Sequence, residues 1–119
     1  MTGIGFDENE WPASLDAMAA APDHHEVLLE NDRVRVLDSI VGPGDSTPVH
    51  THRWPSVLYI IGFSDFVRKN GEGNVIYDSR SAETKPQPGS AVWSGPLAPH
   101  SVTNLGDADI RVISVELKD

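Results

Sequence analysis

Short stretches of β-branched, aromatic and alternating apolar residues, separated by turn-forming residues, limit most strongly how this chain can fold. The strand-like stretches are residues 27–29, 33–41, 49–53, 56–63, 65–68, 74–77, 90–93, 100–103 and 109–117. Glycine, proline and asparagine fill the gaps, as in residues 42–48 and 70–73. Many short strands at close spacing predict an all-β sandwich or barrel.

One short helix is expected before the first strand. Ser14 stands where an N-cap would, the helix formers of residues 15–21 follow it, and Pro22 ends the segment. We therefore divide the chain into an N-terminal extension, residues 1–24, and a β domain, residues 25–119, with the helix against the outside of that domain. A length of 119 residues fits a single domain of this kind.

The composition excludes several classes of function. The chain has no cysteine, which excludes disulfides, thiolate catalysis and thiolate metal sites. Its formal charge of −9 opposes binding to nucleic acid and to anionic membranes. The acidic start of the chain lacks a basic segment followed by an apolar run, and no apolar stretch reaches membrane-spanning length. We therefore expect a cytoplasmic protein without a signal peptide.

Three histidines carry the clearest chemical signal in the sequence. His50 and His52 are two residues apart, so their side chains would project from the same face of a strand. Joined by His100 from another strand, they would surround one cation, and neutral imidazole suits zinc, iron, copper, nickel and manganese. The same spacing also arises on ordinary polar strand faces near turns. On spacing alone, both interpretations therefore remain open.

The residues around the first two histidines resemble the first motif of the cupin superfamily. That motif reads G-x5-H-x-H-x3,4-E-x6-G, and Gly44, His50 and His52 match its opening. The motif glutamate would fall at Ser56 or Val57, and neither side chain can replace it. The resemblance is therefore to a three-histidine variant, of the kind known among cupin dioxygenases, in which the acidic ligand is absent.

The second cupin motif, G-x5-P-x-G-x2-H-x3-N, is matched by Gly89, His100 and Asn104 with both long intervals preserved. Its inner proline and glycine positions hold Gly95 and Leu97 instead. The resemblance covers residues 25–117. It implies a small single-domain RmlC-like cupin, that is, a jelly-roll β-barrel, with the three matched histidines as ligands of a divalent metal ion.

Further residues are candidates for a substrate pocket. Arg53 directly follows the histidine pair and would hold a substrate carboxylate in two hydrogen bonds, although an arginine at a strand end is more often solvated. Ser56 takes the place of the motif glutamate and would face the metal. Trp93 would line the mouth of the pocket or pack in the core. His24 and His25 are adjacent and would face opposite ways, and we interpret both as surface or lid residues.

The resemblance implies a metal-dependent small-molecule enzyme, with dioxygenase-like chemistry as the best single hypothesis. The metal would be iron, manganese, nickel or zinc, held more weakly than in a cupin with four ligands. Open positions on a cation without an acidic ligand favour anionic small molecules. A non-catalytic small-ligand binding cupin, with a degenerate or empty metal site, is the alternative. We also expect a homodimer, because small cupins commonly pair and pairing hides exposed strand edges.

Overall fold

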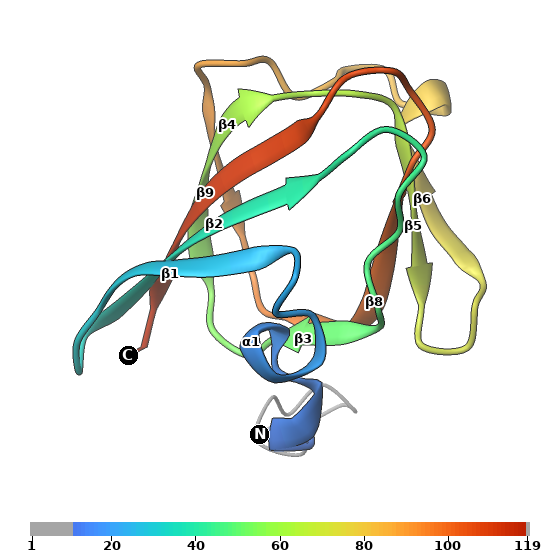
Figure 1. Cartoon of the computed structure of the whole chain (residues 1–119). Coiled ribbons are helices and arrows are strands. Elements are labelled where there is room, and N and C mark those ends of the chain that lie inside the picture. Colours follow the sequence, from blue (N-terminus) through green and yellow to red (C-terminus); the bar gives the residue numbers. More distant parts are fainter. Residues whose placement is uncertain (1–10, 119) are drawn as a thin grey trace.

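The computed structural model describes residues 11–118 and consists mainly of β-strands (Figure 1). They are β1 (His25–Glu30), β2 (Val34–Val41), β3 (His50–His52), β4 (Ser56–Gly62), β5 (Phe66–Asn70), β6 (Val75–Asp78), β7 (Ala91–Ser94), β8 (Leu97–Asn104) and β9 (Ile110–Leu117). Each strand coincides with a stretch predicted from the sequence, so alternation and turn residues suffice to locate them. The largest difference is β8, which begins at Leu97 rather than at residue 100.

The strands form two antiparallel sheets that face each other. One sheet has five strands in the order β1-β2-β9-β4-β7, and the other has four in the order β3-β8-β5-β6. In Figure 1, β1, β2, β9 and β4 run side by side, while β5, β6 and β8 stand on the opposite side of the molecule. The described strands thus form an open jelly roll of two sheets, and the closed barrel expected from the sequence is not formed.

The segment before β1 is shorter as a helix than the sequence suggests. It contains a 3-10 turn, η2 (Ala13–Leu15), and a single α-helical turn, α1 (Ala17–Ala20). Asp16, not Ser14, caps α1 by accepting a hydrogen bond from the backbone of Met18 at 3.1 Å. The buried methyl of Ala17 fixes α1 next to β3 (Figure 1). Across residues 11–118, no helix is both long and apolar enough to span a lipid bilayer.

The motif residues that are not histidines hold the turns. Gly44 and Gly89 have φ angles of 76° and 86°, a backbone conformation that favours glycine. Asn104 is 1% exposed, and its side-chain nitrogen donates to the carbonyl oxygens of Val41 and Ala108 at 2.9 and 2.8 Å. The asparagine therefore satisfies backbone groups at the turn after β8.

Candidate metal centre

A cavity of about 290 Å³ lies between the inner faces of the two sheets. Most of its wall is apolar, and five histidines and one arginine also line it. No aspartate or glutamate belongs to the wall as formed by residues 11–118. The lining residues that the following paragraphs use are His24, His25, His50, His52, Ser56, Phe63, Phe66, Arg68, Tyr77, Val92, His100 and Ser114.

The histidines on the four-stranded sheet come from two neighbouring strands. His50 and His52 project from β3, and His100 projects from β8 directly opposite His50 in the register. Between the two pairs of the ladder, β8 carries two residues where β3 carries one, which is a β-bulge at Ala98 and Pro99. Proline fits such a site because its missing N–H leaves no ladder bond unmade. The bulge explains why β8 begins earlier than predicted.

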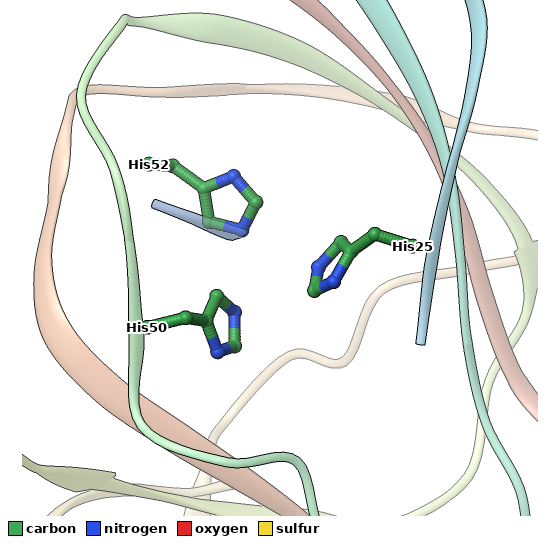
Figure 2. Close-up of side chains that lie close together, drawn as sticks. All are labelled: His25, His50 and His52. Carbon is green, nitrogen blue, oxygen red and sulfur yellow. The ribbon is translucent and has the colours of Figure 1, made fainter. Parts of the chain in front are cut away.

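A further histidine reaches the site from the other sheet. His25 points from β1 toward His50 and His52 across the cavity (Figure 2). One ring nitrogen from each of these three residues lies within 4.8 Å of the others, which positions the group to bind a metal ion. The ring of His100 lies 4.4 Å from that of His50, between centroids. The three histidines expected from the motifs thus face one cavity. The group of three close nitrogens, however, contains His25 in place of His100.

The interpretation of His25 as a surface or lid residue is wrong. It is 7% exposed, and its Nδ1 lies 3.0 Å from the carbonyl oxygen of Ala21, at the end of α1. The adjacent His24 turns instead toward Asp45, at 2.9 Å, although it also touches the cavity. His24 lies in the turn before β1, whereas His25 is the first residue of that strand and shares a strand face with the apolar Val27, while the glutamate between them faces the other way. That alternation is the signal that would have found His25.

Backbone carbonyl groups set the tautomer of three of the four rings. The Nδ1 atoms of His25, His50 and His100 lie 3.0, 2.8 and 2.7 Å from carbonyl oxygens. The carbonyls belong to Ala21, Pro48 and Ala98, respectively. A carbonyl oxygen can only accept, so Nδ1 carries the proton and Nε2 keeps its lone pair for a ligand. Metal-binding histidines are commonly held in this way.

Burial keeps these imidazoles uncharged. Desolvation lowers the pKa of His25 to about 4. Desolvation, followed by the nearby His100, lowers the pKa of His50 to about 2. Desolvation also lowers the pKa of His100 to about 3. At neutral pH the three rings are therefore neutral, which is the form that binds a metal ion.

His52 is held by a carboxylate instead of a carbonyl. Its Nδ1 donates to Oε2 of Glu116 on β9 at 2.8 Å, and Oε1 of Glu116 accepts from Nε of Arg35 at 2.6 Å. Arg35 also donates to both carboxylate oxygens of Asp16 at 2.9 and 3.0 Å. Burial acts to raise the pKa of Glu116, but the hydrogen bonds from His52 and Arg35 outweigh it and lower the pKa.

No protein-family model matches the sequence, and no curated protein matches it. Solved structures do resemble the fold. A cupin domain from Bordetella pertussis superposes with a TM-score of 0.64 at 22% identity, covering 80% of this chain and 92% of that one. The chain has a cupin fold.

Two more structures support this assignment. A double-stranded β-helix domain protein from Klebsiella pneumoniae has a TM-score of 0.56 at 19% identity, covering 99% of this chain and 90% of its own. The polyketide cyclase RemF from Streptomyces resistomycificus has a TM-score of 0.55 at 18% identity, covering 100% of this chain and 80% of its own. At these identities the comparisons establish the fold only.

Of the two positions where the motif glutamate would fall, Ser56 and Val57, only Ser56 lines the cavity. Ser56 is 4% exposed, lines the cavity, and pairs directly with Glu116 in the ladder between β4 and β9. A carboxylate therefore does lie beside this position. It belongs to Glu116 on β9 and accepts a hydrogen bond from Nδ1 of His52. Glu116 shares its strand face with Ser114, which lines the cavity. A glutamate on the inward face of an apolar strand is the signal that the sequence analysis missed.

Arg53 and Trp93, expected at the pocket, lie elsewhere. Neither lines the cavity, whereas Val92, the neighbour of Trp93, does. Trp93 is 63% exposed because strand alternation on β7 turns it outward, opposite Val57. The guanidinium of Arg53 stacks near the ring of Trp54 at 5.7 Å.

The arginine that does line the cavity is Arg68 on β5. It shares its strand face with Phe66, two residues earlier, which also lines the cavity. No role was expected for Arg68 from the sequence. The alternation of an aromatic and a basic residue was the available signal.

Proposed function

We propose that this cupin is a metal-dependent enzyme that acts on a small molecule bound in the cavity beside the histidines. The observation that carries the proposal is the group formed by His25, His50 and His52, whose nitrogens lie within 4.8 Å of one another. A divalent iron, manganese, nickel or zinc ion suits such a set of imidazoles and would keep open positions. Bound there, the ion would supply Lewis-acid or oxygen-dependent chemistry, and dioxygenase-like chemistry is the reaction type we favour.

The residues of the chain itself would bind and orient the substrate. A cavity of about 290 Å³ is close to the lower end of the range for ligand pockets, about 300–1,000 Å³, and so suits a small molecule. Its apolar wall would exclude water from the reacting groups. Because no carboxylate of residues 11–118 lines the cavity, the metal would keep its full charge and favour an anionic substrate. RemF, a polyketide cyclase, supports the proposal as an enzyme of this fold and similar length.

The second candidate is a cupin that binds a small ligand without converting it. The observation that favours it is the same absence of aspartate and glutamate from the cavity wall formed by residues 11–118. Paired carboxylates are a common source of general acid and base groups, and this wall offers none. A binder would need only the cavity and its histidines.

Titration of zinc into untagged, metal-free protein tests the metal site. We expect the wild type to bind one zinc ion per chain, and His50→Ala to lose this binding because it removes one of the three ligand nitrogens. Arg53→Gln, which lies outside the cavity, serves as the matched control and should bind as the wild type does. Equal zinc affinity in the wild type and His50→Ala would contradict the metal site.

Nitric oxide distinguishes oxygen chemistry from simple binding. Loaded with ferrous iron under argon and exposed to nitric oxide, the protein should give the electron paramagnetic resonance signal of an iron–nitrosyl group. The signal requires an open position on the iron that a diatomic gas can reach through the cavity. Bound iron without this signal would contradict dioxygenase-like chemistry and favour the non-catalytic candidate.

We further propose that two copies of the chain pair through the outer face of the five-stranded sheet. Val36, Val115, Val57 and Trp93 lie directly opposite one another across four strands and form an uncharged row on that face. Val57 and Trp93 are 37% and 63% exposed. With a net charge of −9, two copies repel each other over most of their surface, and this row is where they can approach.

Light scattering at micromolar concentration tests the pairing. The wild type should have the mass of a dimer, and Trp93→Glu should have the mass of a monomer because it places two like charges against each other. Leu105→Glu, which changes an exposed apolar residue away from this row, should stay dimeric. A monomeric wild type would refute the dimer.

A further inference from the structure

Arg68 occupies the middle of the four-stranded sheet and lines the cavity. On β5 it lies directly opposite Tyr77 of β6 and Val102 of β8. His100 lies two residues before Val102 on the same face of β8, so it is the diagonal neighbour of Arg68. Arg68 also contributes to the lowered pKa of His100. A permanent positive charge therefore stands beside the histidines, inside the same cavity.

This charge has no anionic partner among residues 11–118. The Nε atom of Arg68 is buried and makes no hydrogen bond there. Arg68 forms no ion pair with the carboxylates of that part of the chain, and none of those carboxylates lines the cavity. The guanidinium carbon of Arg68 lies over the ring of Tyr77, 6.0 Å from its centroid, in a cation–π arrangement. Burial lowers the pKa of Arg68, which reflects the same unfavourable desolvation. Charges removed from water are normally paired, so the half-buried guanidinium of Arg68 offers an anion a partner in the cavity.

The wall around Arg68 indicates the shape of the molecule that would carry this anion. The rings of Phe66 and Tyr77 are 5.4 Å apart, and those of Phe63 and Phe66 are 6.2 Å apart, between centroids. All three side chains line the cavity. Flat apolar groups pack favourably against such rings. A guanidinium binds a carboxylate through two parallel hydrogen bonds, which a neutral group cannot reproduce.

We propose that Arg68 binds the carboxylate of a small aromatic carboxylic acid whose ring packs against Phe63, Phe66 and Tyr77. This inference rests on the proposed function, because it assigns the substrate class of the same cavity. The ligand would reach from Arg68 on β5 toward His100 on the neighbouring strand β8 and the histidine pair on β3, the next strand beyond it. Arg68 is thus the specificity-determining residue, the role that the sequence analysis gave to Arg53.

The test uses metal-free protein, so that it does not depend on the metal site. Acetate, benzoate and 3-phenylpropionate, each beside its amide, are titrated into wild-type protein, Arg68→Met and Arg53→Gln, in buffer without carboxylate or phosphate. Binding is followed by nuclear magnetic resonance, from the chemical shifts of the protein's backbone amide groups. We expect the wild type to bind benzoate or 3-phenylpropionate at least about tenfold more tightly than the matching amide. A hydrogen bond to a charged group contributes enough binding energy for this difference.

Arg68→Met should remove the preference for the acid, and Arg53→Gln should keep it. Arg68→Met should also unfold at a temperature no lower than the wild type without ligand, because it removes an unpaired buried charge. The proposal is overturned if the wild type prefers no acid over its amide, if Arg68→Met keeps the preference, or if Arg68→Met unfolds earlier and so has a structural role. Failure of zinc to bind would overturn the proposed function and leave this result standing.

Discussion

Arg35 and Arg68 are both held inside the molecule, but only Arg35 is surrounded by anions. Behind His52, the guanidinium of Arg35 is shared between the carboxylates of Asp16 and Glu116. In the cavity, Arg68 meets aromatic rings and histidines, and its Nε has no partner among residues 11–118.

The difference separates two uses of a buried charge. Arg35 holds the carboxylate of Glu116, which orients His52, so this charge already stabilises the folded chain without a ligand. The charge of Arg68 has no anionic partner among residues 11–118, and we expect an anionic ligand to compensate it. Replacing each arginine with an apolar residue of similar length should therefore have opposite consequences.

The largest effect is expected from Arg35→Met. Removing this cation leaves the fully buried carboxylate of Glu116 without its guanidinium partner. Breaking a buried pair in this way lowers the free energy of unfolding by about 3–5 kcal/mol. Urea unfolding of metal-free protein, monitored by circular dichroism, measures the change. Arg68→Met should show no such loss, and similar losses in both variants would end the distinction between the two arginines.

The next effect concerns which histidine completes the metal group. His25→Ala removes one of the three nitrogens that lie within 4.8 Å of one another, so zinc affinity should fall by more than about 100-fold, beyond the range of outer-shell changes. His100→Ala should cost less affinity. Zinc titration of both variants measures this. A greater loss in His100→Ala would favour the set expected from the cupin motifs.

A smaller loss is expected when the carboxylate behind His52 is neutralised. Glu116→Gln keeps an oxygen that can accept from Nδ1 but removes the negative charge that strengthens the imidazole as a ligand. Zinc affinity should fall by about 10–100-fold, the usual range for such partners. Glu30→Gln, which changes an exposed carboxylate paired with Lys118, is the control and should leave the affinity unchanged. Unaltered zinc binding in folded Glu116→Gln would show that the charge does not act on the site.

The smallest effect is a gain. Ser56→Glu restores a carboxylate at the position of the cupin glutamate and should tighten zinc binding by about tenfold, or about 1.4 kcal/mol, while weakening the binding of anionic ligands. The new side chain pairs with Glu116 in the ladder, so the metal-free variant should unfold at a lower temperature than the wild type. Ser56→Gln provides the uncharged comparison. Weaker zinc binding in the folded glutamate variant would mean that Ser56 does not face the metal.

The positions of the strands could be predicted from the sequence because they depend on local properties. The alternation at the start of β2, the β-branched and aromatic run of β4, and the glycines and prolines between strands all act over a few residues. The cap of α1 could not be predicted, because Asp16 is chosen over Ser14 partly through its pairing with Arg35, a residue of another element. The position of a helix cap cannot be predicted from local sequence where a residue of another element stabilises it.

The candidate site was only partly predictable for the same reason. His50, His52 and His100 follow from spacing and motif, and the structure brings them to one cavity. His25 and Glu116 reach the site from β1 and β9, so their roles depend on which strands pair and in which register. Residue type alone could not distinguish Arg68 from Arg53, because the two differ in whether the side chain points into the cavity.

The pairing of β2 with β9 has a consequence for the making of the protein. The hairpins β1–β2 and β5–β6 close over short loops, whereas Val34 pairs with Leu117, near opposite ends of the described chain. Such long-range pairing forms late and slowly. During synthesis, the histidines emerge from the ribosome before Glu116, the residue that orients His52. A growing chain therefore carries these histidines before the site is complete, and a metal ion, if the proposed site binds one, would meet the finished group only after β9 has paired.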